Sequence, residues 1–156
     1  MVRHSLAVAL LALTLAACGG GSRAATTSSG TGTSQYTRQV QGYLANIASA
    51  AEKQGFRRVV GGPVFGSLDD DEKSSHEMTV VSGVDYVLFG ACDNDCTDVD
   101  LIVYDQNNRL VKRDILADDK PVVMFTAARS AKYRIEVVMA VCSTEPCRYG
   151  IQLNAK

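Results

Sequence analysis

The chain has 156 residues, with 16 Lys and Arg against 17 Asp and Glu and a formal net charge of −1. Its longest basic run is Arg57-Arg58, and no basic segment is interleaved with aromatic residues as a nucleic-acid groove requires. We therefore expect no nucleic-acid partner. The acidic run at 69–72 (DDDE) is interpreted as a solvated loop.

The N-terminus has the pattern of an export signal. Arg3 and His4 precede an apolar run at 6–15 that is interrupted only by Thr14. A run of about ten residues matches the apolar core of a signal peptide and falls short of the roughly twenty that a membrane-spanning helix needs. Residues 1–17 are therefore predicted to direct export.

The segment LAACG, which ends in Cys18 and Gly19, resembles the lipobox of bacterial lipoproteins. The resemblance implies that Cys18 is acylated, that residues 1–17 are removed, and that the protein is anchored outside the cytoplasm. The alternative is ordinary cleavage after a small residue, which would leave a soluble periplasmic or secreted protein.

Several acyl chains on one residue are sufficient for stable attachment to a membrane, so no second membrane signal is required. By resemblance to the sorting rule of such lipoproteins, Gly19 in place of aspartate favours the outer membrane. The expected location is the cell envelope, on the outer membrane facing the periplasm if the cell has two membranes.

Residues 18–34 are expected to form a tether. After Cys18 the segment consists almost wholly of glycine, serine, threonine and alanine, which cannot bury enough apolar surface to offset the entropy of ordering. Sixteen or so residues of this kind have a typical reach of roughly 20 to 25 Å. The remainder, 35–156, has the length of a single domain.

The domain begins with a predicted amphipathic helix at 36–55. Ser34 is a plausible N-cap and Gly55 a plausible C-terminal stop, although Gly42 lowers the helix propensity. Apolar residues recur at intervals of three and four: Tyr36, Val40, Tyr43, Leu44, Ile47 and Ala51. We interpret this stripe as a face packed on a neighbouring element.

Short runs rich in Val, Ile, Tyr and Phe follow, separated by turn residues such as Ser82-Gly83 and Gln106-Asn107-Asn108. The predicted strands are 57–65, 78–81, 86–91, 99–105, 110–115, 121–127, 133–141 and 149–153. With about seven to eight strands and no helix between them, the region 57–154 is predicted to be an antiparallel, jelly-roll-like β-sandwich.

Of the five cysteines, one lies in the predicted lipobox and four lie in the predicted domain. If Cys18 is acylated, an even set remains that suits two disulfides in an oxidising compartment: Cys92, Cys96, Cys142 and Cys147. We favour the local pairings 92–96 and 142–147. The crossed pairings need Cα atoms within about 7 Å across two loops. The spacings do not favour a thiol redox centre or a zinc site.

Three segments resemble the pre-peptidase C-terminal type of β-sandwich. They are GVDYVL at 83–88, DVDLIVYD at 98–105 and YRIEV at 133–137, and in that family such segments form core strands. The resemblance spans roughly residues 64–153, and the two cysteine pairs depart from the common family pattern. It implies an accessory, non-catalytic domain, and some domains of this family bind calcium.

The aspartates Asp93, Asp95, Asp98 and Asp100 are candidate calcium ligands, because calcium takes oxygen ligands from carboxylates. Their spacing does not match an EF-hand. In the alternative interpretation, which we favour, Asp93 and Asp95 bind turn N–H groups while Asp98 and Asp100 share one face of a strand.

Catalysis is not expected. Beyond the signal peptide the only histidine is His76, and nothing in the sequence shows its imidazole both buried beside a carboxylate and within reach of a serine. The sequence therefore predicts a non-catalytic, envelope-anchored binding module for a protein or glycan. A calcium-binding sandwich is the alternative, and a hydrolase is the third possibility.

Overall fold

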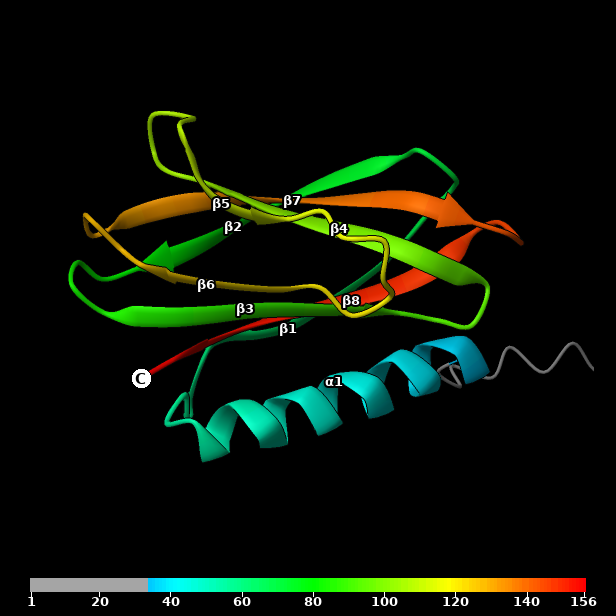
Figure 1. Cartoon of the computed structure of the whole chain (residues 1–156), viewed down its shortest axis with the longest axis horizontal. Helices are drawn as coiled ribbons and strands as arrows, with labels where there is room; N and C mark the ends of the chain where they lie inside the picture. The colour runs from blue at the N-terminus through cyan, green and yellow to red at the C-terminus, as the bar shows by residue number, and fades with distance from the viewer. Residues whose placement is uncertain (1–33) are drawn as a thin grey trace, which may run out of the picture. The chain divides into compact units, whose positions relative to one another are not determined.

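The structure, a computed structural model, describes residues 34–156, which contain one helix and eight strands (Figure 1). The predicted signal peptide, Cys18 and the predicted tether up to residue 33 lie outside the described residues. The elements are α1 (Gln35–Lys53), β1 (Arg58–Leu68), β2 (Lys73–Val80), β3 (Asp85–Cys92), β4 (Cys96–Tyr104), β5 (Leu110–Asp114), β6 (Val122–Thr126), β7 (Ala131–Cys142) and β8 (Cys147–Ala155).

The strands form two antiparallel sheets of four strands each. Sheet A has the order β1-β8-β3-β6 and sheet B the order β2-β7-β4-β5. Successive strands alternate between the sheets except at β4–β5, so the chain winds as a jelly roll, the double-sheet arrangement of two Greek keys. The predicted mainly-β sandwich with a preceding helix is confirmed.

The core between the sheets follows from strict alternation along the strands. On β4, Val99, Leu101 and Val103 point inward and are buried, while the residues between them are partly exposed. The inward residues of β7 and β8 complete the same apolar cluster. Each apolar face thereby leaves water, which is the main driving force for folding.

Helix α1 covers the outer face of sheet A (Figure 1). The hydroxyl of Ser34 accepts a hydrogen bond from the N–H of Thr37 at 3.1 Å, so this residue is the N-cap as predicted. Val40, Leu44 and Ala51 are buried and belong to a second apolar cluster with outward residues of β3. Strand β3 is therefore buried on both faces, and the domain has three layers.

Two polar side chains are buried under the helix. Asn154 Nδ2 donates to the carbonyl of Phe56 at 3.0 Å, and Gln152 Nε2 donates to Asn154 Oδ1 at 2.8 Å. These bonds connect the segment after the helix to β8. They also supply hydrogen-bond partners for the two buried amides, which would otherwise destabilise the fold.

The sandwich has two distinct ends. The disulfide end carries the loops 69–72, 93–95 and 143–146, and the hairpin end carries the loops 81–84, 105–109 and 127–130. Helix α1 starts at the disulfide end, where Gln39 and Tyr43 contact Asn94, and finishes near Phe56 at the hairpin end. Among residues 34–156, no helix has both the length and the apolar character needed to cross a membrane.

Candidate functional site

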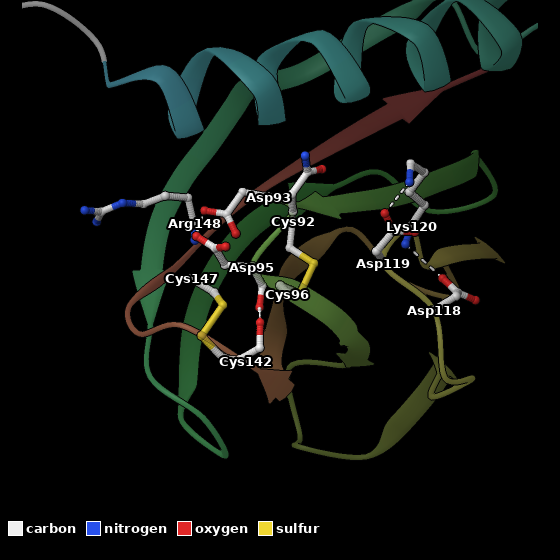
Figure 2. The surroundings of a disulfide bond; sticks show 12 residues. Cys92, Asp93, Asp95, Cys96, Asp118, Asp119, Lys120, Cys142, Cys147 and Arg148 are labelled. Atoms are coloured by element: carbon white, nitrogen blue, oxygen red, sulfur yellow. Dashed lines mark hydrogen bonds and ion pairs between the residues drawn. A yellow bond between two sulfur atoms is a disulfide. The ribbon is translucent and has the colours of Figure 1, made fainter.

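Both local disulfides are present. Cys92 pairs with Cys96 and Cys142 with Cys147, with Cα–Cα distances of 5.9 and 5.8 Å (Figure 2). The favoured connectivity is thus the one observed. All four sulfurs are consumed in these bonds, so none is a free thiolate for redox chemistry or zinc binding.

Backbone hydrogen bonds join the two disulfide loops to each other. The N–H of Asp93 donates to the carbonyl of Arg148 at 3.0 Å, and Asp93 Oδ2 accepts from the N–H of Arg148 at 2.9 Å. The N–H and hydroxyl of Ser143 both donate to the carbonyl of Asp95. Figure 2 shows the carboxylates of Asp93 and Asp95 beside the second disulfide, while the guanidinium of Arg148 points away.

Asp93 is the most buried of the four aspartates that the sequence singled out, with 1% of its surface exposed. Its Oδ1 has no hydrogen-bond partner within the described part of the chain. Burial raises the pKa of this carboxyl, the N–H of Arg148 opposes that rise, and the charge of Asp95 adds to it. Asp93 therefore serves as a buried acceptor that connects two loops.

Asp98 and Asp100 lie on β4 and face outward from sheet B, as expected for alternate residues of a strand. Burial raises the pKa of Asp100, and the charges of Asp98, Asp114 and Asp118 raise it further. Asp98 Oδ1 is buried and lacks a hydrogen-bond partner within residues 34–156. These two carboxylates thus belong to an acidic surface that includes residues of the loop after β5.

The four candidate calcium ligands separate into a loop pair, Asp93 and Asp95, and a strand pair, Asp98 and Asp100. Over residues 34–156, no group of three or more His, Cys, Asp or Glu side chains is arranged to hold a metal ion. The alternative role for Asp93, hydrogen bonding to a backbone N–H, is present. Calcium binding at these positions stays a prediction.

His76 bridges the two sheets at the edge of the core. Its Nε2 lies 2.9 Å from the hydroxyl of Tyr149 on β8 and 3.2 Å from the hydroxyl of Ser74 on its own strand β2. Burial lowers the pKa of the imidazole. A catalytic triad orients its histidine with a carboxylate, whereas the partners of His76 are two hydroxyls. Through the hydroxyl of Tyr149, His76 connects β2 of sheet B to β8 of sheet A.

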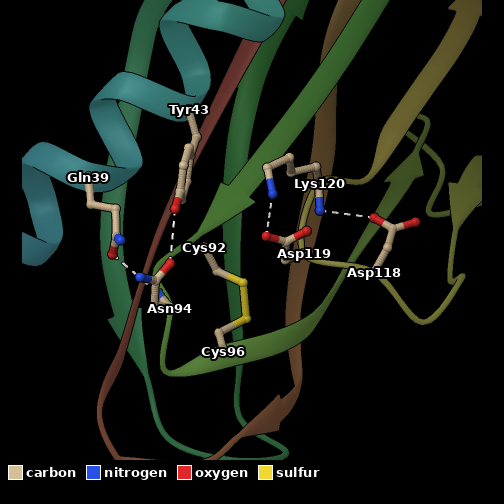
Figure 3. Close-up of polar contacts among 8 residues, drawn as sticks. All are labelled: Gln39, Tyr43, Cys92, Asn94, Cys96, Asp118, Asp119 and Lys120. Atoms are coloured by element: carbon tan, nitrogen blue, oxygen red, sulfur yellow. Dashed lines mark hydrogen bonds and ion pairs between the residues drawn. A yellow bond between two sulfur atoms is a disulfide. The ribbon is translucent and has the colours of Figure 1, made fainter.

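The first half of α1 is fastened to the disulfide end by a polar network (Figure 3). The hydroxyl of Tyr43 donates to Asn94 Oδ1 at 2.9 Å, and the N–H of Asn94 donates to Gln39 Oε1 at 3.2 Å. Lys120 Nζ pairs with the carboxylate of Asp119 and lies 4.7 Å from the centre of the Tyr43 ring. The helix, the loop 93–95 and the segment before β6 therefore form one connected end.

The hairpin end contains a polar cleft of about 500 Å³, which we call the hairpin-end cleft. One wall is the loop between β4 and β5, the other is the loop between β6 and β7, and β7 contributes one residue. The lining residues are Asp105, Gln106, Asn107, Arg109, Ala128, Arg129 and Tyr133. A smaller cleft of about 300 Å³ adjoins it and shares Asp105 and Gln106.

Hydrogen bonds hold the first wall of this cleft in one conformation. Asp105 Oδ1 accepts from the N–H groups of Asn107 and Arg109 at 2.8 and 2.9 Å. Asn108 adopts a φ of 58°, a left-handed conformation that asparagine tolerates. The sequence predicted this hairpin turn from its asparagines but not that it would form the wall of a cleft.

The second wall is held by the turn between β2 and β3. The N–H of Ser82 donates to the hydroxyl of Ser130 at 2.9 Å, and its own hydroxyl donates to the carbonyl of Ala128 at 3.0 Å. The N–H of Gly83 donates to the carbonyl of Ala127 at 2.8 Å. Both walls of the cleft are thus ordered by the protein itself.

The arginines of the cleft differ from neighbouring cations in their pairing. Lys132 pairs with Glu77 at 2.9 Å, and Arg134 pairs with Glu136 at 3.0 Å and covers the ring of Tyr104. Arg109 and Arg129 form no ion pair with any residue in 34–156. Within the described residues, the cleft therefore carries two guanidinium groups outside any ion pair, together with one carboxylate, that of Asp105.

A second, smaller groove of about 220 Å³ runs between α1 and the edge strand β6. It is lined mainly by apolar side chains, among them Ile47 of the helix and Val122 and Met124 of the strand. Val122 and Met124 are exposed. The groove is the open margin of the helix–sheet interface.

No protein-family model matches the chain, and no curated protein matches it in sequence. Among solved structures, it is similar to the crystal structure of Aeromonas hydrophila PliG, a periplasmic lysozyme inhibitor of g-type lysozyme. The TM-score is 0.45 at 11% sequence identity, over 63% of this chain and 88% of that chain. A likeness of this size carries no argument about function.

Proposed function

We propose that the chain is a non-catalytic binding module of the cell envelope, anchored by lipid on Cys18 and facing its partner with the hairpin end. The observation that carries this proposal is the arrangement of the domain. The chain enters it at Ser34, at the disulfide end, and the hairpin-end cleft of about 500 Å³ lies at the opposite end. Such an arrangement leaves the cleft accessible when the other end is held.

The LAACG segment supports the lipid anchor, and Gly19 supports the outer membrane, facing the periplasm, as the destination in a cell with two membranes. The environment of His76 supports a non-catalytic role, because no carboxylate among the described residues forms a hydrogen bond or ion pair that would orient its imidazole as a general base. A relationship to pre-peptidase C-terminal domains is part of the same proposal. Its three motifs lie on, or run into, β3, β4 and β7.

The anchor is tested by the intact mass of the protein isolated from cell membranes. We expect loss of residues 1–17, addition of acyl chains and two disulfides. The variant Cys18→Ser should move from the membrane fraction to the soluble fraction while its circular dichroism stays unchanged. A soluble wild-type protein, or five free thiols, would contradict the proposal.

The calcium-binding alternative is favoured by one observation, the buried and unpartnered Oδ1 of Asp98 beside the carboxylate of Asp100. The test is a thermal melt with calcium and with a chelator. A binding site would raise the melting temperature in calcium through ligand stabilisation of the folded state. Asp100→Asn should then abolish the difference, whereas Asp105→Asn at the other end should leave it unchanged.

A further inference from the structure

The hairpin-end cleft contains two arginines that have no ion-pair partner within the described residues 34–156. Arg109 comes from one wall and Arg129 from the other, and both side chains are exposed. The only carboxylate in the lining, Asp105, already uses its Oδ1 to hold two backbone N–H groups. The cleft is therefore a site where an anionic group would gain charge-assisted hydrogen bonds.

The rest of the lining indicates the class of ligand. Gln106 and Asn107 supply amide groups to the lining. Ala128 is its one small apolar residue, and the remaining lining residue, Tyr133, is buried. A protein partner is usually held by a desolvated aromatic or aliphatic centre, which this lining lacks. Amides and guanidiniums around a polar cleft suit a ligand rich in hydroxyl and carboxylate groups.

The size and the order of the cleft support the same ligand class. A volume of about 500 Å³ lies within the range of small-molecule sites, and it is large enough for one or two sugar rings. Hydrogen bonds that Asp105 accepts and that Ser82 donates hold both walls before any ligand arrives. Because the walls are already ordered, little conformational entropy is lost on binding.

We propose that the hairpin-end cleft binds a carboxylate-bearing saccharide, with Arg109 and Arg129 binding the carboxylate and the amides of Gln106 and Asn107 binding ring hydroxyls. This inference rests on the proposed function as a binding module and specifies its ligand. A guanidinium presents donors in a planar fork that matches a carboxylate, which is why arginine suits this role. Lys132 and Arg134 are engaged with Glu77 and Glu136 and contribute to the neighbouring cleft.

The test is calorimetric titration of the full-length protein, in detergent, with trigalacturonate as the acidic probe and maltotriose as the neutral probe. We expect trigalacturonate to bind and maltotriose not to bind. Added salt should weaken the binding of trigalacturonate. Arg109→Gln and Arg129→Gln should each weaken binding by about tenfold or more, because each removes a charge-assisted pair. The matched control is Arg58→Gln, an exposed arginine at the same end but outside the cleft.

Three results would overturn the inference. Trigalacturonate does not bind at millimolar concentration, or Arg58→Gln weakens binding as much as Arg109→Gln, or an acidic hexapeptide of glutamate binds more tightly than the saccharide. A photo-cross-linker placed at Asn107 in cells separates this failure from failure of the proposed function. Cross-linking to an envelope protein without saccharide binding would refute the saccharide and retain the binding module, whereas no cross-linked product and no saccharide binding would refute both.

Discussion

Asp93 and Asp95 lie two residues apart in the same loop, yet only one of them holds the loop in place through its side chain. The carboxylate of Asp93 is buried and accepts the N–H of Arg148, whereas the contact of Asp95 with Ser143 uses its backbone carbonyl. Substitution at Asp95 therefore removes no hydrogen bond recorded for the described residues.

Asp93→Ala should destabilise the domain by about 1 to 3 kcal/mol, because the partly buried N–H of Arg148 would lose its acceptor. Urea denaturation measures the change in the free energy of unfolding. The matched control Asp95→Ala should change it by less than about 0.5 kcal/mol, as expected for a side chain without such a bond. Equal losses in the two variants would show that Asp93 does not hold the loops through its carboxylate.

His76 makes the stability of the domain depend on pH. Burial places its folded pKa below the ordinary value of 6.5, so the folded state resists protonation more than the unfolded state does. Its contribution is fully present above the unfolded pKa and is lost as pH falls through the lowered folded pKa. His76→Gln cannot titrate and should show a shallower loss of stability on acidification.

The measurement compares the free energy of unfolding at about pH 7.5 and about pH 5.5, on either side of the unfolded pKa of histidine. Thr79→Gln, an exposed change on the same strand, is the control and should keep the wild-type dependence. Carboxylates titrate in all three proteins and cancel in the comparison. An unchanged slope in His76→Gln would show that the imidazole is not the responsive group.

Among the elements, α1 is held close to sheet A by a glycine of β8. A Cβ at Gly150 would lie 2.7 Å from Leu44 Cδ1 and 2.9 Å from the ring of Phe65, so a methyl group would force these side chains to shift. The missing side chain is therefore what lets Leu44 of the helix pack directly on the strand.

Gly150→Ala should destabilise the domain by about 1 to 3 kcal/mol, as overpacking does in a well-filled core. Gly42 is the contrasting position, because it lies in the exposed face of α1 with nothing within 4 Å of its missing Cβ. Gly42→Ala should stabilise the domain by about 0.5 to 1 kcal/mol through helix propensity. Urea unfolding measures the free energy of unfolding of both variants. An unchanged value for Gly150→Ala would contradict the close packing of Leu44 on β8, and a lower value for Gly42→Ala would contradict the effect of helix propensity.

The helix and the strands could be predicted because each has a periodic apolar pattern. The least accurate prediction was β2, expected at 78–81 and observed as Lys73–Val80, since the residues KSSHE carry little apolar signal. Those residues form a strand because they pair with β7 through the backbone, with His76 opposite Ile135. Pairing with a distant strand leaves no trace in local sequence.

The hairpin-end cleft could not be predicted for the same reason. Its walls are the loops 105–109 and 128–130, which become neighbours only when the strands assemble. Arg109 and Arg129 look like ordinary surface arginines in the sequence. The disulfides were predictable, in contrast, because each closes a loop between residues four or five apart.

Over the whole molecule, charge is distributed unequally between the two ends. The loops of the disulfide end contain Asp69, Asp70, Asp93, Asp95 and Glu145. The clefts of the hairpin end are lined by four cations, Arg109, Arg129, Lys132 and Arg134, and by two carboxylates, Asp105 and Glu77. Within residues 34–156 the loops of the disulfide end are therefore acidic, whereas the clefts of the hairpin end carry more cations than carboxylates, which favours approach of an anionic ligand to the hairpin end.

The jelly-roll topology also makes the domain depend on its last strand. β8 lies between β1 and β3 in sheet A. Its residue Ala155 is opposite Arg58 of β1 on one side and opposite Tyr86 of β3 on the other. Without β8, β1 has no partner in its sheet and α1 loses the surface formed by Gly150 and Asn154. Folding must therefore wait for contacts between distant parts of the chain, which is typical of slow-folding β-sandwiches.

Deletion of residues 147–156 should therefore abolish cooperative unfolding, and the variant should lack the near-ultraviolet circular dichroism of packed tyrosines. The control removes Lys156 alone, whose N–H donates to the carbonyl of Asp85 at 3.1 Å and whose Nζ lies 5.1 Å from the centre of the Phe56 ring. Loss of that one exposed residue should cost about 1 kcal/mol or less and preserve the transition. If the shortened chain without β8 still unfolds cooperatively, sheet A does not require its central strand, and the domain would have to be held together by sheet B and its core alone.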